Sequence, residues 1–168
     1  MSKAQILAGD FFFSMAIFLL VLGISMVMFN YVAIQVRNNQ EEDFMHIVSL
    51  TTADLLLKTE GYPKDWNESN VKSIGLATND LLNESKVVRF VNMSYDTAKS
   101  GLKINQYDFL ITFNDINGTA LNLSGINMSI GIDPVVESQV VKIHRSTIID
   151  NGTRRIPTII SIVLWRRL

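Results

Sequence analysis

The stretch Phe11–Val36, FFFSMAIFLLVLGISMVMFNYVAIQV, decides the architecture of this chain. It contains 26 consecutive residues without a charged side chain, and its first 19 residues hold only two serines and one glycine among apolar side chains. As an α-helix the stretch would rise about 39 Å, which exceeds the roughly 30 Å of a bilayer's hydrocarbon core. Because it is apolar on every face, we interpret it as a membrane-spanning helix, with a buried core helix as the less favoured alternative.

The residues on either side of this stretch indicate how it is oriented. Lys3 precedes it, whereas the acidic Glu41, Glu42 and Asp43 follow it. Basic flanks stay on the cytoplasmic side, so we expect the N-terminus inside and the remainder of the chain outside the cell. A cleaved secretory signal is disfavoured, because its apolar region normally covers about 7–15 residues and ends in a small-residue cleavage site.

The helix is expected to continue beyond the membrane. No glycine or proline occurs between Gly23 and Gly61, and the segment Gly61-Tyr62-Pro63 is a strong stop signal. A single helix from Phe11 to Glu60 would be roughly 75 Å long. Its second half carries two apolar faces, one with Phe44, Ile47, Val48 and Leu55, the other with Leu50, Ala53 and Leu57. Two faces suggest two sets of neighbours, and a helix buried only in its own domain is the alternative.

Residues 61–168 read as a small α+β head. Short helices are expected within 79–91 and 94–101, and 71–77 could be a strand or a helical turn. Strands are expected at 107–113, 119–124, 128–132, 139–149 and 156–165, with turns at Asn117-Gly118 and Asn151-Gly152. Pro157 favours an edge position for the last strand, or pairing only after that residue. The fold class is therefore α+β, a long N-terminal helix carrying an antiparallel sheet of about four strands.

Composition excludes several classes of protein. The 168 residues are 48% hydrophobic and 18% charged, with a mean hydropathy of +0.22, which is unlike a disordered or coiled-coil chain. The net charge of −1 offers no basic excess for a nucleic-acid partner. Without cysteine the chain can form neither disulfides nor thiolate metal sites.

No pattern of catalytic or cofactor-binding residues is present in the sequence. His46 and His144 have no ligand partner at metal spacing, and no phosphate-binding or nucleophile motif occurs. We therefore expect no enzyme activity, no cofactor and no metal. Charge is unevenly spread, with six basic and two acidic residues in 134–168 against eight and thirteen in 37–133. Opposite signs could help copies dock side by side, although a solvated basic hairpin explains the same pattern.

Asparagine in the acceptor pattern Asn-X-Ser/Thr is over-represented. The chain has 14 asparagines, and 24 of its 168 residues are serine or threonine. A random order of these residues would give two such sequons, whereas seven occur, all after residue 66. They begin at Asn67, Asn83, Asn92, Asn117, Asn122, Asn127 and Asn151. Glycans add solubilising surface, so the excess predicts a glycosylated, extracellular head. Turn formation alone accounts for the asparagines of the two Asn-Gly pairs.

Four short motifs stand in a fixed order along the chain: Lys3-Ala4-Gln5 before the apolar segment, Gly61-Tyr62-Pro63-Lys64-Asp65-Trp66, Ile74-Gly75-Leu76-Ala77, and Tyr107-Asp108-Phe109 with a last strand ending at Trp165. With these motifs the chain resembles the archaeal type IV pilin-like proteins, which carry a class III signal peptide. The resemblance implies a leader at 1–4, cleaved by a prepilin peptidase between Ala4 and Gln5. It also implies a transmembrane and assembly helix at 5–36, a helical continuation at 37–60 and an extracellular head at 61–168. Ala4 and Asp10 depart from the family's usual pattern, which has glycine before the cut and an acidic fifth mature residue.

The resemblance implies a structural subunit, major or minor, of an adhesive surface filament, with itself or other pilin-like subunits as partners. The assembly residues would be Asp10, Phe11, Phe12 and Phe13. Asp10 could pair with the freed N-terminal amine of a neighbour, because an unpaired carboxylate in hydrocarbon costs about 2.5–3.5 kcal/mol. A helix N-cap is the alternative role for Asp10. The alternative function is a membrane-anchored module that binds a surface ligand and never polymerises.

Overall fold

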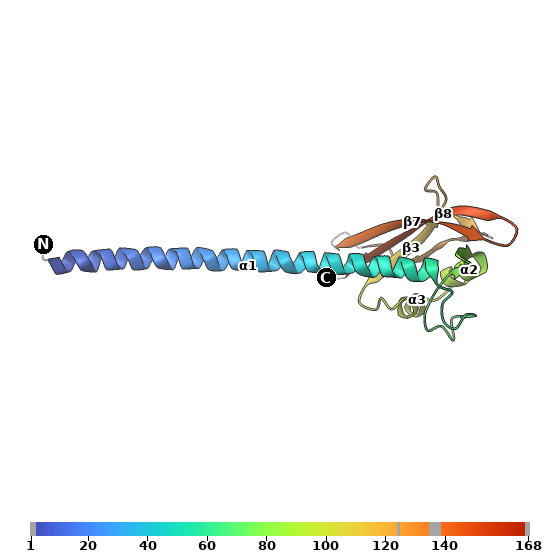
Figure 1. Cartoon of the computed structure of the whole chain (residues 1–168), viewed down its shortest axis with the longest axis horizontal. Coiled ribbons are helices and arrows are strands. Elements are labelled where there is room, and N and C mark those ends of the chain that lie inside the picture. The colour runs from blue at the N-terminus through green and yellow to red at the C-terminus, as the bar shows by residue number, and fades with distance from the viewer. Residues whose placement is uncertain (1–2, 124, 135–138, 167–168) are drawn as a thin grey trace. The chain divides into compact units, whose positions relative to one another are not determined.

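The computed structural model describes residues 3–123, 125–134 and 139–166, and the chain divides into two compact units, Met1–Glu41 and Glu42–Leu168. Helix α1 (Lys3–Lys58) supplies unit 1 and the first part of unit 2 (Figure 1). The expected helix from Phe11 to Glu60 is confirmed to within two residues at its end. It stops where the sequence predicted, because Gly61 has a φ of 82°, a left-handed conformation that suits glycine.

The part of α1 in unit 2 buries one stripe, which is centred between the two expected apolar faces and shares Ala53 with the second of them. Its buried side chains recur at helical spacing: Met45, Ser49, Thr52, Ala53 and Leu56. Phe44, Ile47 and Leu50 are exposed instead. The prediction considered only apolar residues, whereas the stripe also contains the polar side chains of Ser49 and Thr52. Ser49 fits there because its hydroxyl donates to the carbonyl of Met45 at 2.8 Å within the helix.

A six-stranded sheet forms the centre of unit 2, in the order β1-β2-β7-β8-β3-β6. Its strands are β1 (Ala77–Thr78), β2 (Leu81–Asn83), β3 (Asp108–Asn114), β6 (Ser129–Gly131), β7 (Val140–Asp150) and β8 (Arg155–Trp165). The pair β7–β8 is the predicted hairpin, in register from Val140 opposite Trp165 to Asp150 opposite Arg155. β3 lies antiparallel on the other side of β8, which makes β8 an interior strand.

Pro157 was expected to place β8 at an edge of the sheet or to precede its pairing. β8 as a whole is not an edge strand, but it has only one neighbouring strand at Pro157. β3 pairs with β8 only from Ile159 onward, so Pro157 has β7 as its single neighbouring strand. The missing N–H of proline therefore removes no bond to a second strand.

The expectation of an antiparallel, four-stranded sheet is wrong in two respects. The sheet is mixed, because β2 runs parallel to β7, with Leu82 opposite Ile149 and Asn83 opposite Asp150. The expected strand 119–124 is reduced to β4 (Asn122–Leu123), which pairs with β5 (Ile126–Asn127) in a separate two-stranded sheet. Strands of two or three residues have too few side chains for a period of two to appear.

Two short helices complete unit 2, α2 (Glu84–Val91) and α3 (Tyr95–Gly101). The side chain of Asn83 caps α2 by accepting a hydrogen bond from the Lys86 N–H at 3.1 Å. Ser94 is the N-cap of α3, as expected, whereas Gly101 is the last helical residue and not the residue after it. The segment 71–77 contains no helix and joins the sheet only at Ala77.

The core of unit 2 lies between the sheet and its helices. Figure 1 shows the C-terminal part of α1, together with α2 and α3, on one side of the sheet. The largest fully buried side chains include Trp66, Phe90, Phe109, Phe113 and Leu56. They belong to one cluster that also contains the inward-facing isoleucines of β3 and β8. The opposite face of the sheet has no helix from the described residues upon it.

Candidate functional site

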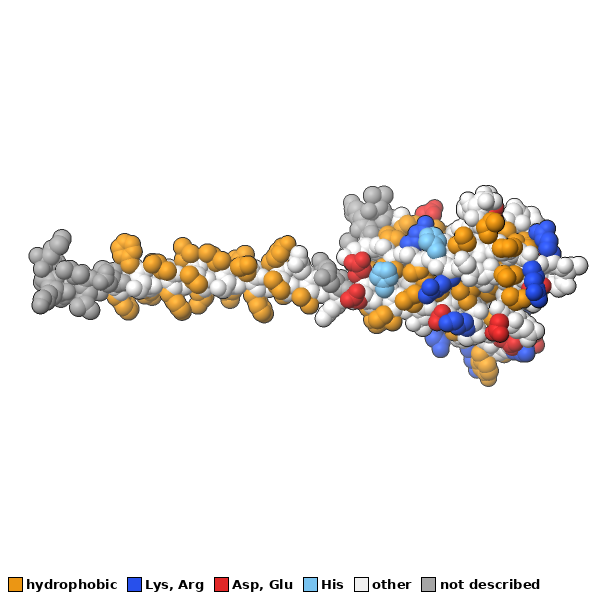
Figure 2. Space-filling view, turned by 45° about the horizontal axis from the view of Figure 1, so that its top comes forward, with side chains coloured by type: hydrophobic (Ala, Val, Ile, Leu, Met, Phe, Trp, Pro, Cys, Tyr) orange, Lys and Arg blue, Asp and Glu red, His pale blue; other side chains and the backbone are white. Residues whose placement is uncertain are grey.

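The first candidate site is the apolar surface of α1 in unit 1. From Phe11 to Val36 its large apolar side chains are between 48% and 75% exposed, and Figure 2 shows them along the helix. Among the described residues this is the one helix long and apolar enough to cross a membrane. In water, so much exposed apolar surface would be strongly unfavourable, at about 25 cal/mol for each Å². Lipid or apolar chains of other molecules around this surface would remove that cost.

Three of the polar side chains within this segment form hydrogen bonds inside the helix. Ser25 donates to the carbonyl of Val21 at 2.8 Å, and Asn30 Nδ2 donates to the carbonyl of Met26 at 3.0 Å. Gln35 Nε2 donates to the hydroxyl of Tyr31 at 3.1 Å. Such bonds lower the penalty for placing a polar side chain in hydrocarbon. Ser25, Asn30 and Gln35 are thus compatible with a membrane environment.

The predicted assembly residues begin this surface. Phe11, Phe12 and Phe13 are 66%, 69% and 75% exposed, and the rings of Phe11 and Phe12 meet edge to face with centroids 6.2 Å apart. Ala4, Gln5 and Asp10 belong to α1, but the structure does not describe their side chains. Residues 1–2 of the expected leader lie outside the described residues.

The sequon asparagines form the second candidate site, on unit 2. Six of the seven are exposed, and Asn83 is partly buried. Six of these asparagines lie close together in three pairs. Asn122 is directly opposite Asn127 in the β4–β5 pair, and Asn83 is opposite Asp150, the residue before Asn151. The third pair consists of the sequons that begin at Asn67 and Asn92. The last pair is joined by the backbone N–H of Ser94, which donates to Glu68 Oε1 at 2.9 Å. Asn117 lies in the turn after β3. Neither β7 nor the unit 2 part of α1 carries a sequon.

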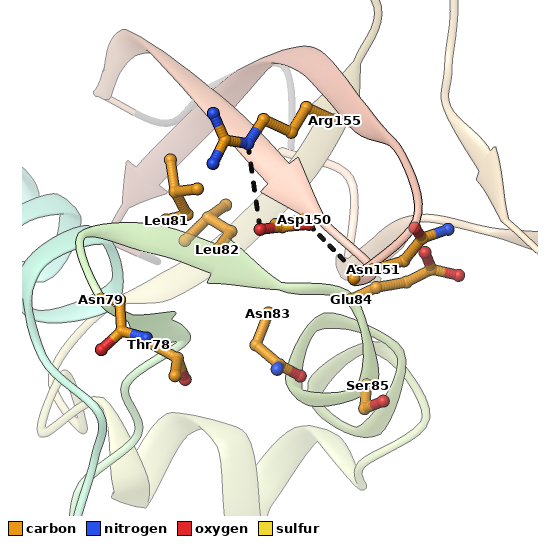
Figure 3. A pocket seen from close by; sticks show the side chains of 11 residues that line it. Thr78, Asn79, Leu81, Leu82, Asn83, Glu84, Ser85, Asp150, Asn151 and Arg155 are labelled. Carbon is orange, nitrogen blue, oxygen red and sulfur yellow. Dashed lines mark hydrogen bonds and ion pairs between the residues drawn. The ribbon is translucent and has the colours of Figure 1, made fainter.

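A polar pocket lies at one end of the sheet (Figure 3). Its volume is about 580 Å³, and its walls come from the β1–β2 turn, the start of α2 and the β7–β8 turn. Arg155 and Asp150 face each other across 4.0 Å, and Asp150 also accepts from the Gly152 N–H at 2.9 Å. Glu84 Oε2 is buried and has no hydrogen-bond partner within the described part of the chain. The pocket therefore offers donors and acceptors to a small polar ligand.

The sequence did not predict this pocket, because its residues come from three segments that become neighbours only through the parallel β2–β7 pairing. The turn residues Asn79 and Asp80 adopt φ values of 53° and 63°, the left-handed conformation that asparagine and aspartate tolerate. Two adjacent residues of this kind were the signal available for a tight hairpin between β1 and β2.

The two histidines lie on different elements of unit 2. His46 is exposed on α1 and His144 is exposed on β7. Within residues 3–123, 125–134 and 139–166, no cluster of three or more acidic or histidine side chains could hold a metal ion.

Comparisons with known proteins give no further assignment. No protein-family model, no curated protein and no solved structure matches the chain.

Proposed function

We propose that this chain is a structural subunit, major or minor, of an archaeal type IV pilus-like surface filament, and that it assembles through its apolar N-terminal helix. The observation that carries the proposal is the combination of length and exposure in α1. The helix continues without interruption from Lys3 to Lys58, and the large apolar side chains described in its first half are exposed. A membrane anchor needs only about 20 apolar residues, so a helix that continues into a folded head is more than an anchor requires.

The proposed pathway has two environments for the same helix. In the membrane, lipid covers Phe11–Val36, with the N-terminus in the cytoplasm and unit 2 outside the cell. After a prepilin peptidase cleaves between Ala4 and Gln5, the helices of neighbouring copies replace the lipid. The polar side chains at Ser25, Asn30 and Gln35 are bonded within the helix, so they need no water in either environment. Glycans on the sequons of unit 2 would face the medium.

Mechanical shearing of intact cells tests the proposal. We expect the sheared material to pellet at high speed and to contain this chain as a repeating filament component in electron micrographs. A chain that stays entirely with the cell membrane after shearing, as a monomer in detergent, would contradict the proposal.

The pocket favours one second candidate, a membrane-anchored surface module that binds a small polar ligand and does not polymerise. The polar lining supports it, since Arg155 offers a guanidinium group and Asp150 a carboxylate to a ligand in the pocket. Screening of neutral oligosaccharides against the full chain and an Arg155→Ala variant tests this candidate. Saturable binding to the full chain, lost in the variant, would support it, and absence of binding would exclude this ligand class.

A further inference from the structure

Two exposed surfaces of unit 2 combine apolar side chains with an unpaired charge. The helix surface consists of Asp43, Phe44, Ile47 and Leu50 on α1, all exposed. The sheet surface consists of the outward residues of β7, Val140, Lys142, His144, Ser146 and Ile148, all exposed as well. Of the seven exposed large apolar residues described in unit 2, these two surfaces hold five. Such patches mark places where another molecule docks.

The two surfaces point in opposite directions. α1 packs its stripe around Met45 and Leu56 against the inner face of the sheet, so the helix surface faces away from the sheet. Strand residues alternate between faces, and the buried Val141 and Ile149 define the inner face of β7. Lys142, His144 and Ser146 therefore lie on the outer face. A contact between surfaces on opposite sides of one molecule is heterologous, and it extends from copy to copy.

The charges of the two surfaces are complementary. Asp43 is acidic and Lys142 is basic, and neither has an ion-pair partner among the described residues. By contrast, the nearby Asp54 is already paired with Lys58 at 2.9 Å. Complementary charges at the rim of an apolar patch favour one docking partner and one register.

The heights of the two surfaces also match. Met45 and Val141 belong to one small cluster, against which Val48 and Ile143 also pack. Figure 1 shows that α1 and β7 run in the same direction. From that common level, Thr51 lies about 9 Å further along the helix and His144 about 10 Å further along the strand. Copies anchored by the same helix in one membrane share one depth. The helix surface of one copy therefore faces the sheet surface of a second copy that is displaced within the membrane plane.

We propose that the helix surface of one copy docks on the sheet surface of the next copy, with Asp43 within reach of the Lys142 side chain. The inference rests on the proposed function, because it takes the partner to be a second copy of this chain. The absence of sequons from β7 and from residues 42–58 supports it, since a glycan on either surface would block the contact. It adds a contact between folded units to the packing of the apolar helices.

Site-directed cross-linking in membranes tests the contact, because the chain has no cysteine of its own. The variant Thr51→Cys/His144→Cys places one thiol beside each surface and leaves both charges intact. With a short thiol cross-linker, we expect a ladder of dimers, trimers and larger products, whereas each single-cysteine variant should give no ladder. In the double-cysteine background, Asp43→Lys or Lys142→Asp should each lower the ladder about three- to fivefold. Both reversals together should restore it.

The matched controls are Asp65→Lys and Lys103→Asp, which reverse exposed charges outside both surfaces and should leave the ladder unchanged. A ladder that does not change with the charge reversals would overturn the inference. Dimers that already form in a single-cysteine variant, with no larger products in the double-cysteine variant, would overturn it as well. Absence of the ladder in cells whose sheared filaments still contain the chain would overturn it and leave the proposed function intact. Absence of both ladder and filaments would overturn both.

Discussion

The indole Nε1 of Trp66 donates a hydrogen bond to the carbonyl oxygen of Gly75 across 3.0 Å, in the buried interior of unit 2. The bond closes the loop that follows α1. Arg89 extends it from α2, since its Nη1 donates to the carbonyl of Trp66 at 2.6 Å and its guanidinium lies 5.8 Å from the Trp66 ring. Gly61 and Gly75 lie against each other beneath this contact, so the loop depends on the absence of two side chains.

Replacement of Gly75 by alanine is expected to destabilise unit 2 by at least about 3 kcal/mol. A Cβ at this position would overlap the Thr59 hydroxyl and two backbone atoms, the nitrogen of Gly61 and the carbonyl oxygen of Thr59, and the backbone atoms cannot rotate away. Urea unfolding of the detergent-solubilised chain, followed by tryptophan fluorescence, measures the change. Gly118→Ala is the control, because no heavy atom lies within 4 Å of a Cβ there and only its positive φ opposes the change. Equal losses at both positions would refute the packing argument.

Lys86 should make unit 2 more stable as the pH rises toward 10.5. Burial lowers the pKa of Lys86 below its usual value, and Glu60 opposes this only in part. The unfolded chain therefore binds the proton more tightly than the folded chain, so stability increases between the folded and unfolded pKa values. The difference in unfolding free energy between wild type and Lys86→Met should grow in favour of wild type across that range. A difference that is constant with pH would contradict the direction of the shift.

The sequon asparagines should differ in their response to substitution. Asn83→Ala is expected to destabilise unit 2 by about 1 kcal/mol, because the Asn83 side chain caps α2. Asn127→Ala should change stability far less, since that side chain is exposed and makes no cap.

Peptide mass spectrometry of the native protein should find glycans on the exposed asparagines. Unmodified peptides throughout, or a head that protease cannot reach from outside intact cells, would contradict the extracellular assignment.

The sequence predicted the large elements well and their long-range arrangement poorly. The hairpin β7–β8 was predictable because two long β-branched runs flank Asp150-Asn151-Gly152. The parallel β2–β7 pair was not, since Leu82 and Ile149 are far apart in the chain and only two residue pairs join them. The pocket depends on that pair and was missed with it. The buried stripe of α1 was also missed, because Ser49 and Thr52 are polar yet face the core.

Asp10 gives a test of how the apolar helix assembles. Asn caps a helix about as well as Asp but carries no charge. If Asp10 pairs with the amine of a neighbouring copy, then Asp10→Asn and Asp10→Ala should both lose filaments while remaining processed and membrane-bound. Filament yield after shearing, with the membrane fraction as the control, separates the two roles. Filaments that persist in Asp10→Asn and disappear only in Asp10→Ala would assign Asp10 to capping alone.

The intact mass of the chain extracted from membranes and filaments tests the central claim most directly. The claim is that α1 is released from a short leader and then packs against other copies, which requires cleavage between Ala4 and Gln5. The account predicts one N-terminus, at Gln5, in the filament fraction. A mature chain that still begins at Met1 or Ser2 would contradict the filament assignment and favour the anchored binding module.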